Sequence, residues 1–485
     1  MKKSILITLC IAIGVHGITN AQKVKNYKPV SINYVDLSDG ATVTAQPIHT
    51  KKLKIKSSEK SGSSVEIKLN DVIHSNLSGI GGAFNEQGGE AFMSLCKKDQ
   101  NKLAKNLFSV KKGIGFSMCR TAVGASDFGL GAYSYSETPE DYEMKHFSVE
   151  RDETSVIPFI NAAKRKNPEL KIFASPWSPP GWMKETGKMD DGAIRKEQGP
   201  KKRMMWVNNG KNYLRDEAKI YKAYALYFTK YVQAYAKQGV TIERLAIQNE
   251  TDMNTIYPSC DMSPEQMSNL AFKYIQPAFD RANLKTEVWA GTFRGKRDDA
   301  LKFIGLEGAN KIDGIAMQYA GPNEVKDIYN AGYPVMHTEG KCYNSKNTME
   351  QARSRFREVS MWLNAGSENY CYWNMVLNEE SKSGWGWKQN SMIKIDRNLN
   401  TITYNPDYAP IALLSKFIRP GDKSIKTVTP KKVDALTIKN EKQLIVFLQN
   451  DTDTVATKNI ELSDQNYSVE LPAKSLCAFV FEPEK

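Results

Sequence analysis

Two short apolar runs of the sequence each end in a glutamate. The run at 244–250 ends in the letters QNE, and the run at 334–339 ends in HTE, so that Glu250 and Glu339 occupy equivalent positions. Two carboxyl groups can hydrolyse a glycosidic bond if one, protonated, donates to the leaving oxygen and the other, ionised, attacks the anomeric carbon. A single glutamate at a strand end is usually a surface or capping residue. The pair is what indicates glycosidase chemistry.

The elements around these glutamates follow a βα rhythm. From about residue 78, short apolar runs alternate with helical stretches, such as 220–238, a pattern typical of a parallel sheet with crossover helices. Eight strands are expected, at 79–84, 114–123, 171–177, 244–250, 286–292, 312–319, 334–339 and 369–374. Eight such units close into a (β/α)8 TIM barrel, in which residues at the C-terminal strand ends point into the mouth. Glu250 and Glu339 end strands four and seven, so we expect their carboxyl groups to lie a few ångströms apart.

Two long insertions, at 187–214 and after Asn374, follow strands and should therefore lie at the same face. The basic stretch 195–203 in the first insertion is expected to be a solvated loop. It has no interleaved aromatic residues and no nucleic-acid-binding motif, so we expect no nucleic-acid partner.

Strand-like alternation of apolar and polar residues occurs before the barrel, at 23–69, and again after about residue 410. The strands before the barrel have no place in it, so we expect them to join the later ones in one all-β sandwich. The predicted divisions are 1–21 as a signal peptide, 22–75 as N-terminal strands of the sandwich, 76–408 as the catalytic barrel and 409–485 as the rest of the sandwich.

The N-terminus reads as a secretory signal. Lys2 and Lys3 precede an apolar run at 5–15, and small residues lead to an expected cut after Ala21. The run is too short to span a bilayer. We therefore expect a secreted or periplasmic protein without stable membrane insertion. Its formal charge of +13 indicates a solubilising surface before it indicates an acidic ligand.

The composition excludes several classes of protein. Six cysteines remain after the signal, which is far below the density of a disulfide scaffold, and there is no CxxC pair. The chain has five histidines, and His16 lies in the signal, so clustered metal ligands are missing. We expect no metal and no cofactor.

The longer motifs resemble glycoside hydrolase family 30, which includes glucosylceramidases, β-1,6-glucanases and certain xylanases. The matching stretches are GIGGAFNEQG (79–88), SMCRTAVGASDFGLGAYSY (117–135), ASPWSPPGWMK (174–184), LAIQNE (245–250), HTEGKC (337–342) and YWNMVLNEESKSGWGWKQNS (372–391). They cover most of the barrel in the family's order. The resemblance implies a (β/α)8 barrel with a β-sandwich, a retaining mechanism and no metal.

The resemblance also implies residue roles. Glu250 matches the acid/base and Glu339 the nucleophile. The other matching positions are expected to bind substrate or support the nucleophile: Arg120, Asp127, Trp177, Asn249, Tyr319, Trp373 and Asn374. For Arg120 a structural ion pair is equally compatible, and core packing is the rival interpretation for Trp373. Two departures, Thr251 where relatives carry proline and Gln318 where they often carry histidine, leave the subsite contacts open.

The substrate is predicted less directly. The stretch WGWKQNSM (385–392) resembles the branch with β-1,6-glucanases more than the xylanases. We therefore expect an endo-β-1,6-glucanase first, and a glucosylceramidase-like β-glucosidase or a xylanase as alternatives. A protein that binds glycans without cleaving them is an alternative of another class. The oligomeric state is left open.

Overall fold

The structure, a computed structural model, describes residues 26–53, 64–198, 200, 202–208, 210–295, 297–342, 344–431 and 433–484. The predicted signal peptide and its cleavage point at Ala21 lie outside these residues. No helix among the described residues is long and apolar enough to cross a membrane.

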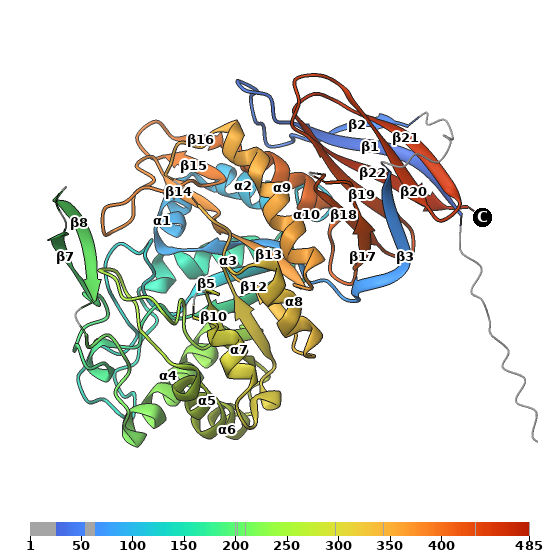
Figure 1. Cartoon of the computed structure of the whole chain (residues 1–485). Helices are drawn as coiled ribbons and strands as arrows, with labels where there is room; N and C mark the ends of the chain where they lie inside the picture. Colours follow the sequence, from blue (N-terminus) through green and yellow to red (C-terminus); the bar gives the residue numbers. More distant parts are fainter. Residues whose placement is uncertain are drawn as a thin grey trace, which may run out of the picture.

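Eight parallel strands form the predicted barrel (Figure 1). They are β4 (Gly79–Phe84), β5 (Met118–Ala122), β6 (Lys171–Ser175), β9 (Arg244–Ala246), β10 (Glu287–Phe293), β11 (Gly314–Met317), β12 (Val335–His337) and β13 (Asn369–Asn374). From β4 to β12 each barrel strand pairs with the next, and β13 pairs with β4. Backbone bridges from Val335 to Ser367 and from Gly340 to Tyr372 join β12 to β13 and close the ring. The (β/α)8 prediction is confirmed. Only β10 extends past its predicted range, by one residue, while several strands are shorter than predicted: β5 begins at Met118 rather than at 114, and β9 ends at Ala246 rather than at 250.

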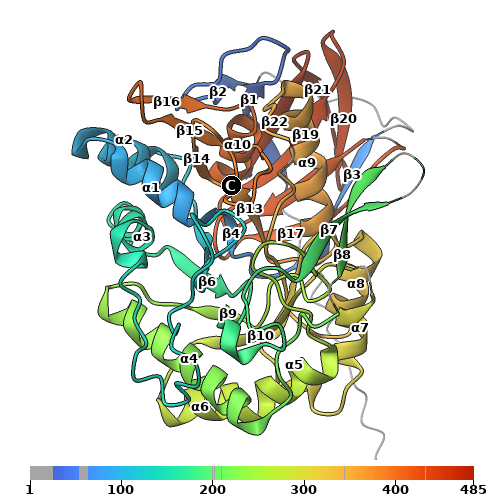
Figure 2. The ribbon, with the colours of Figure 1, turned by 90° about the vertical axis from the view of Figure 1, so that its left-hand side faces the viewer.

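Helices surround the strands (Figure 2). They are α1 (Glu86–Ser94), α2 (Lys97–Phe108), α3 (Val156–Lys164), α4 (Ala218–Lys237), α5 (Pro264–Leu270), α6 (Gln276–Arg281), α7 (Asp299–Ile304), α8 (Pro322–Asn330), α9 (Met349–Asn364) and α10 (Tyr408–Phe417). Single turns of 3-10 helix occupy Asp152–Thr154, Gly181–Met183 and Ala309–Lys311, and a π-helical turn at Ala271–Ile275 joins α5 to α6. The longest helix, α4, buries a tyrosine-rich face at the spacing that its sequence predicts.

The two insertions contain sheets of their own. The first holds an antiparallel hairpin of β7 (Ala193–Gln198) and β8 (Arg203–Asn208). The expectation of a loop at 195–203 is therefore wrong over most of its length, because pairing satisfies the backbone groups that a loop would leave to water. The second holds β14 (Val376–Asn378), β15 (Ile393–Asp396) and β16 (Thr401–Tyr404). The two insertions meet where Trp385 Nε1 donates to Asp190 Oδ2 at 3.4 Å.

Strands from both ends of the chain form one nine-stranded sheet. They are β1 (Tyr27–Asp36), β2 (His49–Lys52), β3 (Val65–His74), β17 (Lys423–Val428), β18 (Ala435–Lys439), β19 (Leu444–Asn450), β20 (Ala456–Leu462), β21 (Gln465–Leu471) and β22 (Ser475–Pro483). The strand β1 pairs with β22, and β3 lies between β17 and β20. Because β21 also packs against β19 and β22, the sheet folds over a core of its own. The predicted sandwich of N- and C-terminal strands is confirmed, while the residue limits assigned to each domain stay a prediction.

The barrel and the sandwich share apolar packing. Val35, Leu436, Ile438 and Phe447 from the sandwich belong to the same buried cluster as the barrel helices. The helices α9 and α10 lie between the two units (Figure 1) and contact strands β1, β17, β18 and β22. The sandwich is thus attached through a core.

Candidate active site

Both predicted carboxyl groups lie at C-terminal strand ends of the barrel. Glu250 follows β9 by four residues, Glu339 follows β12 by two, and the two residues are 6% and 7% exposed. Glu250 has a left-handed backbone with φ of +46°, which is unusual for a residue with a side chain. Its N–H donates to Thr292 Oγ1 at 3.2 Å, which holds this conformation. Such strained backbone is often found at functional sites.

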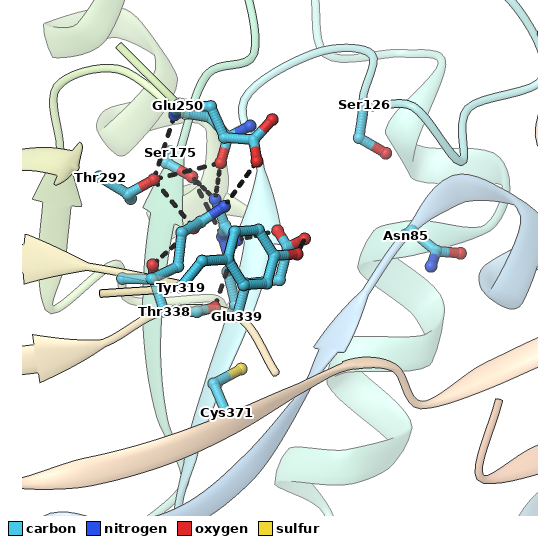
Figure 3. A network of polar contacts seen from close by, with 12 residues as sticks. Asn85, Ser126, Ser175, Glu250, Thr292, Tyr319, Thr338, Glu339 and Cys371 are labelled. Atoms are coloured by element: carbon cyan, nitrogen blue, oxygen red, sulfur yellow. Dashed lines mark hydrogen bonds and ion pairs between the residues drawn. The ribbon is translucent and has the colours of Figure 1, made fainter. Parts of the chain in front are cut away.

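A fully buried arginine on β5 connects these strand ends. Arg120 donates through Nη1 to Glu339 Oε2 at 2.8 Å and through Nη2 to Asn249 Oδ1 at 2.7 Å. Its Nε and Nη2 also donate to Ser175 Oγ, at 3.1 and 2.7 Å. Figure 3 shows Ser175 and Glu339 as parts of this network. The sequence left ion pairing and a role near the nucleophile both open for Arg120, and the structure places it in an ion pair with Glu339.

Glu339 is surrounded by donors. Besides Arg120, the hydroxyl of Tyr319 on the segment after β11 donates to Glu339 Oε1. Charge-assisted contacts of this kind are about twice as strong as neutral ones. They favour the ionised form of Glu339, which a nucleophile needs.

Three residues around Glu250 were missed by sequence reasoning as parts of the site. Tyr257 donates to Glu250 Oε2 at 3.3 Å, and Gln318 Nε2 donates to Glu250 Oε1, also at 3.3 Å. The Nη1 atom of Arg294 lies 3.6 Å from the same Oε1. Gln318 had been noticed only as a departure from the relatives. Tyr257 and Arg294 come after barrel strands in the chain, and that position was the only sequence feature that could have indicated a place in the site.

The two carboxyl groups titrate together. Burial raises the pKa of Glu250, and burial together with the charge on Glu250 raises the pKa of Glu339 to about 7. Because a negative charge on either carboxyl group disfavours ionisation of the other, the two groups share one proton. The pair therefore keeps one proton up to about pH 7. The shorter, charged contacts of Glu339 place the negative charge there and the proton on Glu250.

Aromatic and acidic groups complete the interior of the barrel mouth. The rings of Trp177 and Trp373 stack with their centroids 5.0 Å apart, and the Arg120 guanidinium lies 4.4 Å from the Trp177 ring. Asp127 is buried, and burial together with the charges of the two glutamates raises its pKa well above the ordinary range. Its Oδ1 atom, like Nε1 of Trp373, has no hydrogen-bond partner among the described residues.

The two asparagines of the predicted set differ in what they can still bind. Asn249 uses Oδ1 to accept from Arg120 at 2.7 Å, and this oxygen also lies 3.2 Å from the Thr292 hydroxyl. Asn374 is fully buried, donates from Nδ2 to Gln389 Oε1 at 2.6 Å and accepts at Oδ1 from Asn85 at 3.1 Å. Both ends of the Asn374 amide are thus held by the protein.

Among the described residues, no group of three His, Cys, Asp or Glu side chains is placed to hold a metal ion. His337, beside the site, is fully buried, and burial and the nearby Arg120 charge lower its pKa well below the usual value. It stacks on Tyr370 with ring centroids 4.4 Å apart and serves packing.

The chain was compared with known proteins. A family model described as the TIM-barrel domain of glycosyl hydrolase family 30 matches residues 77–289. The lysosomal acid glucosylceramidase of Mus musculus is 24% identical over 392 residues, which are 75% of this chain and 72% of that protein. The endo-1,6-beta-D-glucanase BGN16.3 of Trichoderma harzianum is 32% identical over 217 residues, 44% of this chain and 42% of that protein.

A solved structure, the endo-beta1,6-glucanase BT3312, superposes with a TM-score of 0.77 at 20% identity, covering 94% of this chain and 99% of its own. That similarity extends the shared fold from the barrel to the sandwich. The family match over residues 77–289 and the relatives agree that this barrel is similar to the TIM-barrel domain of glycosyl hydrolase family 30, a family of glycoside hydrolases.

Proposed function

We propose that this glycoside hydrolase cleaves β-glucosidic bonds with retention of configuration, with Glu339 as nucleophile and Glu250 as acid/base. One observation carries the assignment: of the two buried carboxyl groups, Glu339 alone has a short ion pair, to Arg120 at 2.8 Å, whereas Arg294 lies 3.6 Å from Glu250. The carboxylate is therefore favoured on Glu339, and the remaining proton on Glu250.

The reaction has two steps. In the first, Glu250 donates its proton to the glycosidic oxygen while the Glu339 carboxylate attacks the anomeric carbon, which gives a glycosyl-enzyme. In the second, Glu250 takes a proton from water, and the water oxygen displaces Glu339. As Glu339 loses its negative charge in the first step, its contacts with Arg120 and Tyr319 weaken. They strengthen again in the second step, when Glu339 leaves the sugar as a carboxylate.

Substrate contacts are proposed for the residues around this pair. Asn249 keeps its Nδ2 donor for a sugar 2-hydroxyl, since Oδ1 is already occupied. The partnerless Oδ1 of Asp127 can accept from sugar hydroxyl groups. Trp177 and Trp373 stack on each other and are almost fully buried, so we propose that they form an apolar wall of the sugar subsite. For Asn374 we propose support of the neighbouring Trp373, because both ends of its amide are bound within the protein.

β-1,6-Glucan is the substrate that we propose first, with endo action, and a glucosyl lipid second. The glucanase of Trichoderma harzianum is the more identical of the two relatives, over 44% of this chain, and the mouse glucosylceramidase matches over more of it. We further propose export with cleavage near Ala21, which the mass of the mature protein would test.

The test is the product profile on β-1,6-glucan. We expect gentiooligosaccharides whose newly formed end is initially the β-anomer, observed by proton NMR, and we expect Glu339→Gln to bind the glucan without turnover. For Glu250→Gln we expect a loss of about 10²–10⁴-fold on the glucan. If the protein hydrolyses only a β-glucosyl lipid or only xylan, the proposed substrate is wrong, while the proposed mechanism still stands. Binding without cleavage of any β-glycan by the wild type would favour the binding protein, and an initial α-anomer would refute retention.

A further inference from the structure

The carboxamide of Gln318 is held in one orientation. Its Oε1 atom accepts from the hydroxyls of Thr292, at 2.9 Å, and Thr338, at 2.8 Å. The residue is fully buried, so no solvent competes for these contacts. Since one end of the amide is occupied as an acceptor, the other end, Nε2, is presented as a donor.

That donor meets one particular oxygen of Glu250. Gln318 Nε2 lies 3.3 Å from Oε1, and the Arg294 guanidinium lies 3.6 Å from the same atom. Arg294 is held in turn by Asp252, with 3.1 Å between Nε and Oδ1. Amide and guanidinium nitrogens donate and do not accept. A proton on Oε1 would therefore face the N–H groups of Gln318 and Arg294 and would find no acceptor there.

The second oxygen of Glu250 has a different neighbour. Tyr257 contacts Oε2 at 3.3 Å through its hydroxyl group. A hydroxyl can donate to an ionised oxygen and, after rotation, accept from a protonated one. The surroundings of Oε2 thus tolerate both protonation states, while those of Oε1 tolerate one.

We infer that Gln318 is a positioning residue which keeps Oε1 of Glu250 as an acceptor and so places the catalytic proton on Oε2. The inference rests on the proposed role of Glu250 as acid/base. In the first step the Oε2–H bond breaks, the proton passes to the leaving oxygen, and that oxygen keeps the electron pair of the broken glycosidic bond. In the second step Oε2 receives a proton from the attacking water.

The amide suits this role because it carries no charge. The ionisable groups that face or act on Glu250 are already numerous: Arg294, Asp252, Tyr257, Asp127, Glu339 and Tyr319. Gln318 adds a donor whose strength does not change with pH. Its hydrogen bond stabilises the ionised form of Glu250 and lowers the pKa of that carboxyl.

The experiment compares two substrates with each variant. The proton from Glu250 is needed for phenyl β-glucoside, whose leaving group is poor, and is hardly needed for 2,4-dinitrophenyl β-glucoside, whose leaving group departs as an anion. For Gln318→Met we expect kcat/KM on the phenyl glucoside to fall about 10- to 100-fold, with a change below about threefold on the dinitrophenyl glucoside. We also expect the alkaline limb of the pH profile to move upward, because a donor to the ionised form has been removed.

Three further variants keep the outcomes separate. Gln100→Met replaces a buried glutamine on α2, far from the site, and should leave both substrates unchanged. Gln318→Glu puts a second acid beside Glu250 and should raise the alkaline limb further. For Glu250→Gln, kcat/KM should fall selectively on the phenyl glucoside. An equal fall on both substrates would refute the acid/base assignment itself. Suppose that Glu250→Gln is selective, but Gln318→Met lowers kcat/KM equally on both substrates or leaves the alkaline limb unchanged. Then the positioning role of Gln318 is refuted, and the acid/base role of Glu250 is not.

Discussion

Arg120 joins the parts of the site at the scale of single residues. A buried guanidinium is costly to desolvate unless its donors find acceptors. Here Nε, Nη1 and Nη2 all do, on Ser175, Glu339 and Asn249. The charge that stabilises Glu339, the proposed nucleophile, is thus in place before substrate binds, as electrostatic preorganisation requires.

The shared proton of the two glutamates sets the pH range of activity. The proposed mechanism needs one proton on the pair, with Glu339 ionised, so kcat/KM should fall at low pH as Glu339 gains a proton. It should fall again as pH rises through about 7, where the raised pKa marks loss of the last proton. A pH–rate profile on the dinitrophenyl glucoside and on the glucan measures this.

The dinitrophenyl glucoside should show a weaker alkaline limb in its first step, since it hardly needs the proton. A rate on the glucan that stays constant well above pH 7 would contradict the assignment of that limb to the glutamate pair.

At the scale of elements, close approach of β4 to β5 aligns Arg120 with the barrel mouth. Gly81 faces the Met118 carbonyl so closely that an added Cβ would lie 1.7 Å from its oxygen. Gly81→Ala must therefore push the strands apart. We expect a loss of at least about 1–3 kcal/mol in the free energy of unfolding, the usual result of overpacking. Activity should fall with it, because Arg120 pairs with Ala83 on the displaced strand.

The matched control is Gly131→Ala. A Cβ at Gly131 would have no heavy atom within 4 Å, and its backbone is not left-handed. Thermal unfolding of both variants, followed by circular dichroism, should show a lower midpoint for Gly81→Ala alone. Equal midpoints would show that the two strands can separate at no cost.

Much of the element pattern could be predicted because βα alternation is periodic. The run at 244–250 was expected to be strand throughout, but β9 ends at Ala246, and the residues up to Glu250 leave the ladder. Because the backbone leaves the strand there, Glu250 turns into the site. Its backbone conformation depends on the hydrogen bond to Thr292 from another strand. The expectation that Glu250 and Glu339 lie at C-terminal strand ends of the barrel nevertheless agrees with the structure.

What the sequence did not predict belongs to loops. Tyr257 and Arg294 reach Glu250 along paths that no periodicity encodes. Gln318 lay on a predicted strand, but its contact depends on the hydroxyls of two neighbouring strand ends. The β7–β8 hairpin was missed because its basic composition hides any alternation.

At the scale of the whole molecule, the sandwich is part of the barrel's support. Polar contacts reinforce the shared core: Arg353 Nη1 donates to the Leu37 carbonyl at 2.8 Å, and Asn364 Nδ2 donates to the Ala435 carbonyl at 2.9 Å. Both donors lie on α9, which follows β12 and the Glu339 segment in the chain. Loosening the sandwich should therefore disturb the site.

We accordingly expect one cooperative unfolding transition for barrel and sandwich, with a calorimetric enthalpy equal to the van't Hoff enthalpy. Phe479→Ala, in the sandwich's own core, should cost about 3–5 kcal/mol. It should lower the temperatures at which the fold and the glycosidase activity are lost by the same amount. Val455→Ala, at a residue that is 63% exposed, should leave both unchanged. Two resolved transitions, with activity surviving the first in Phe479→Ala, would mean that the barrel stands without the sandwich and that their shared core contributes little.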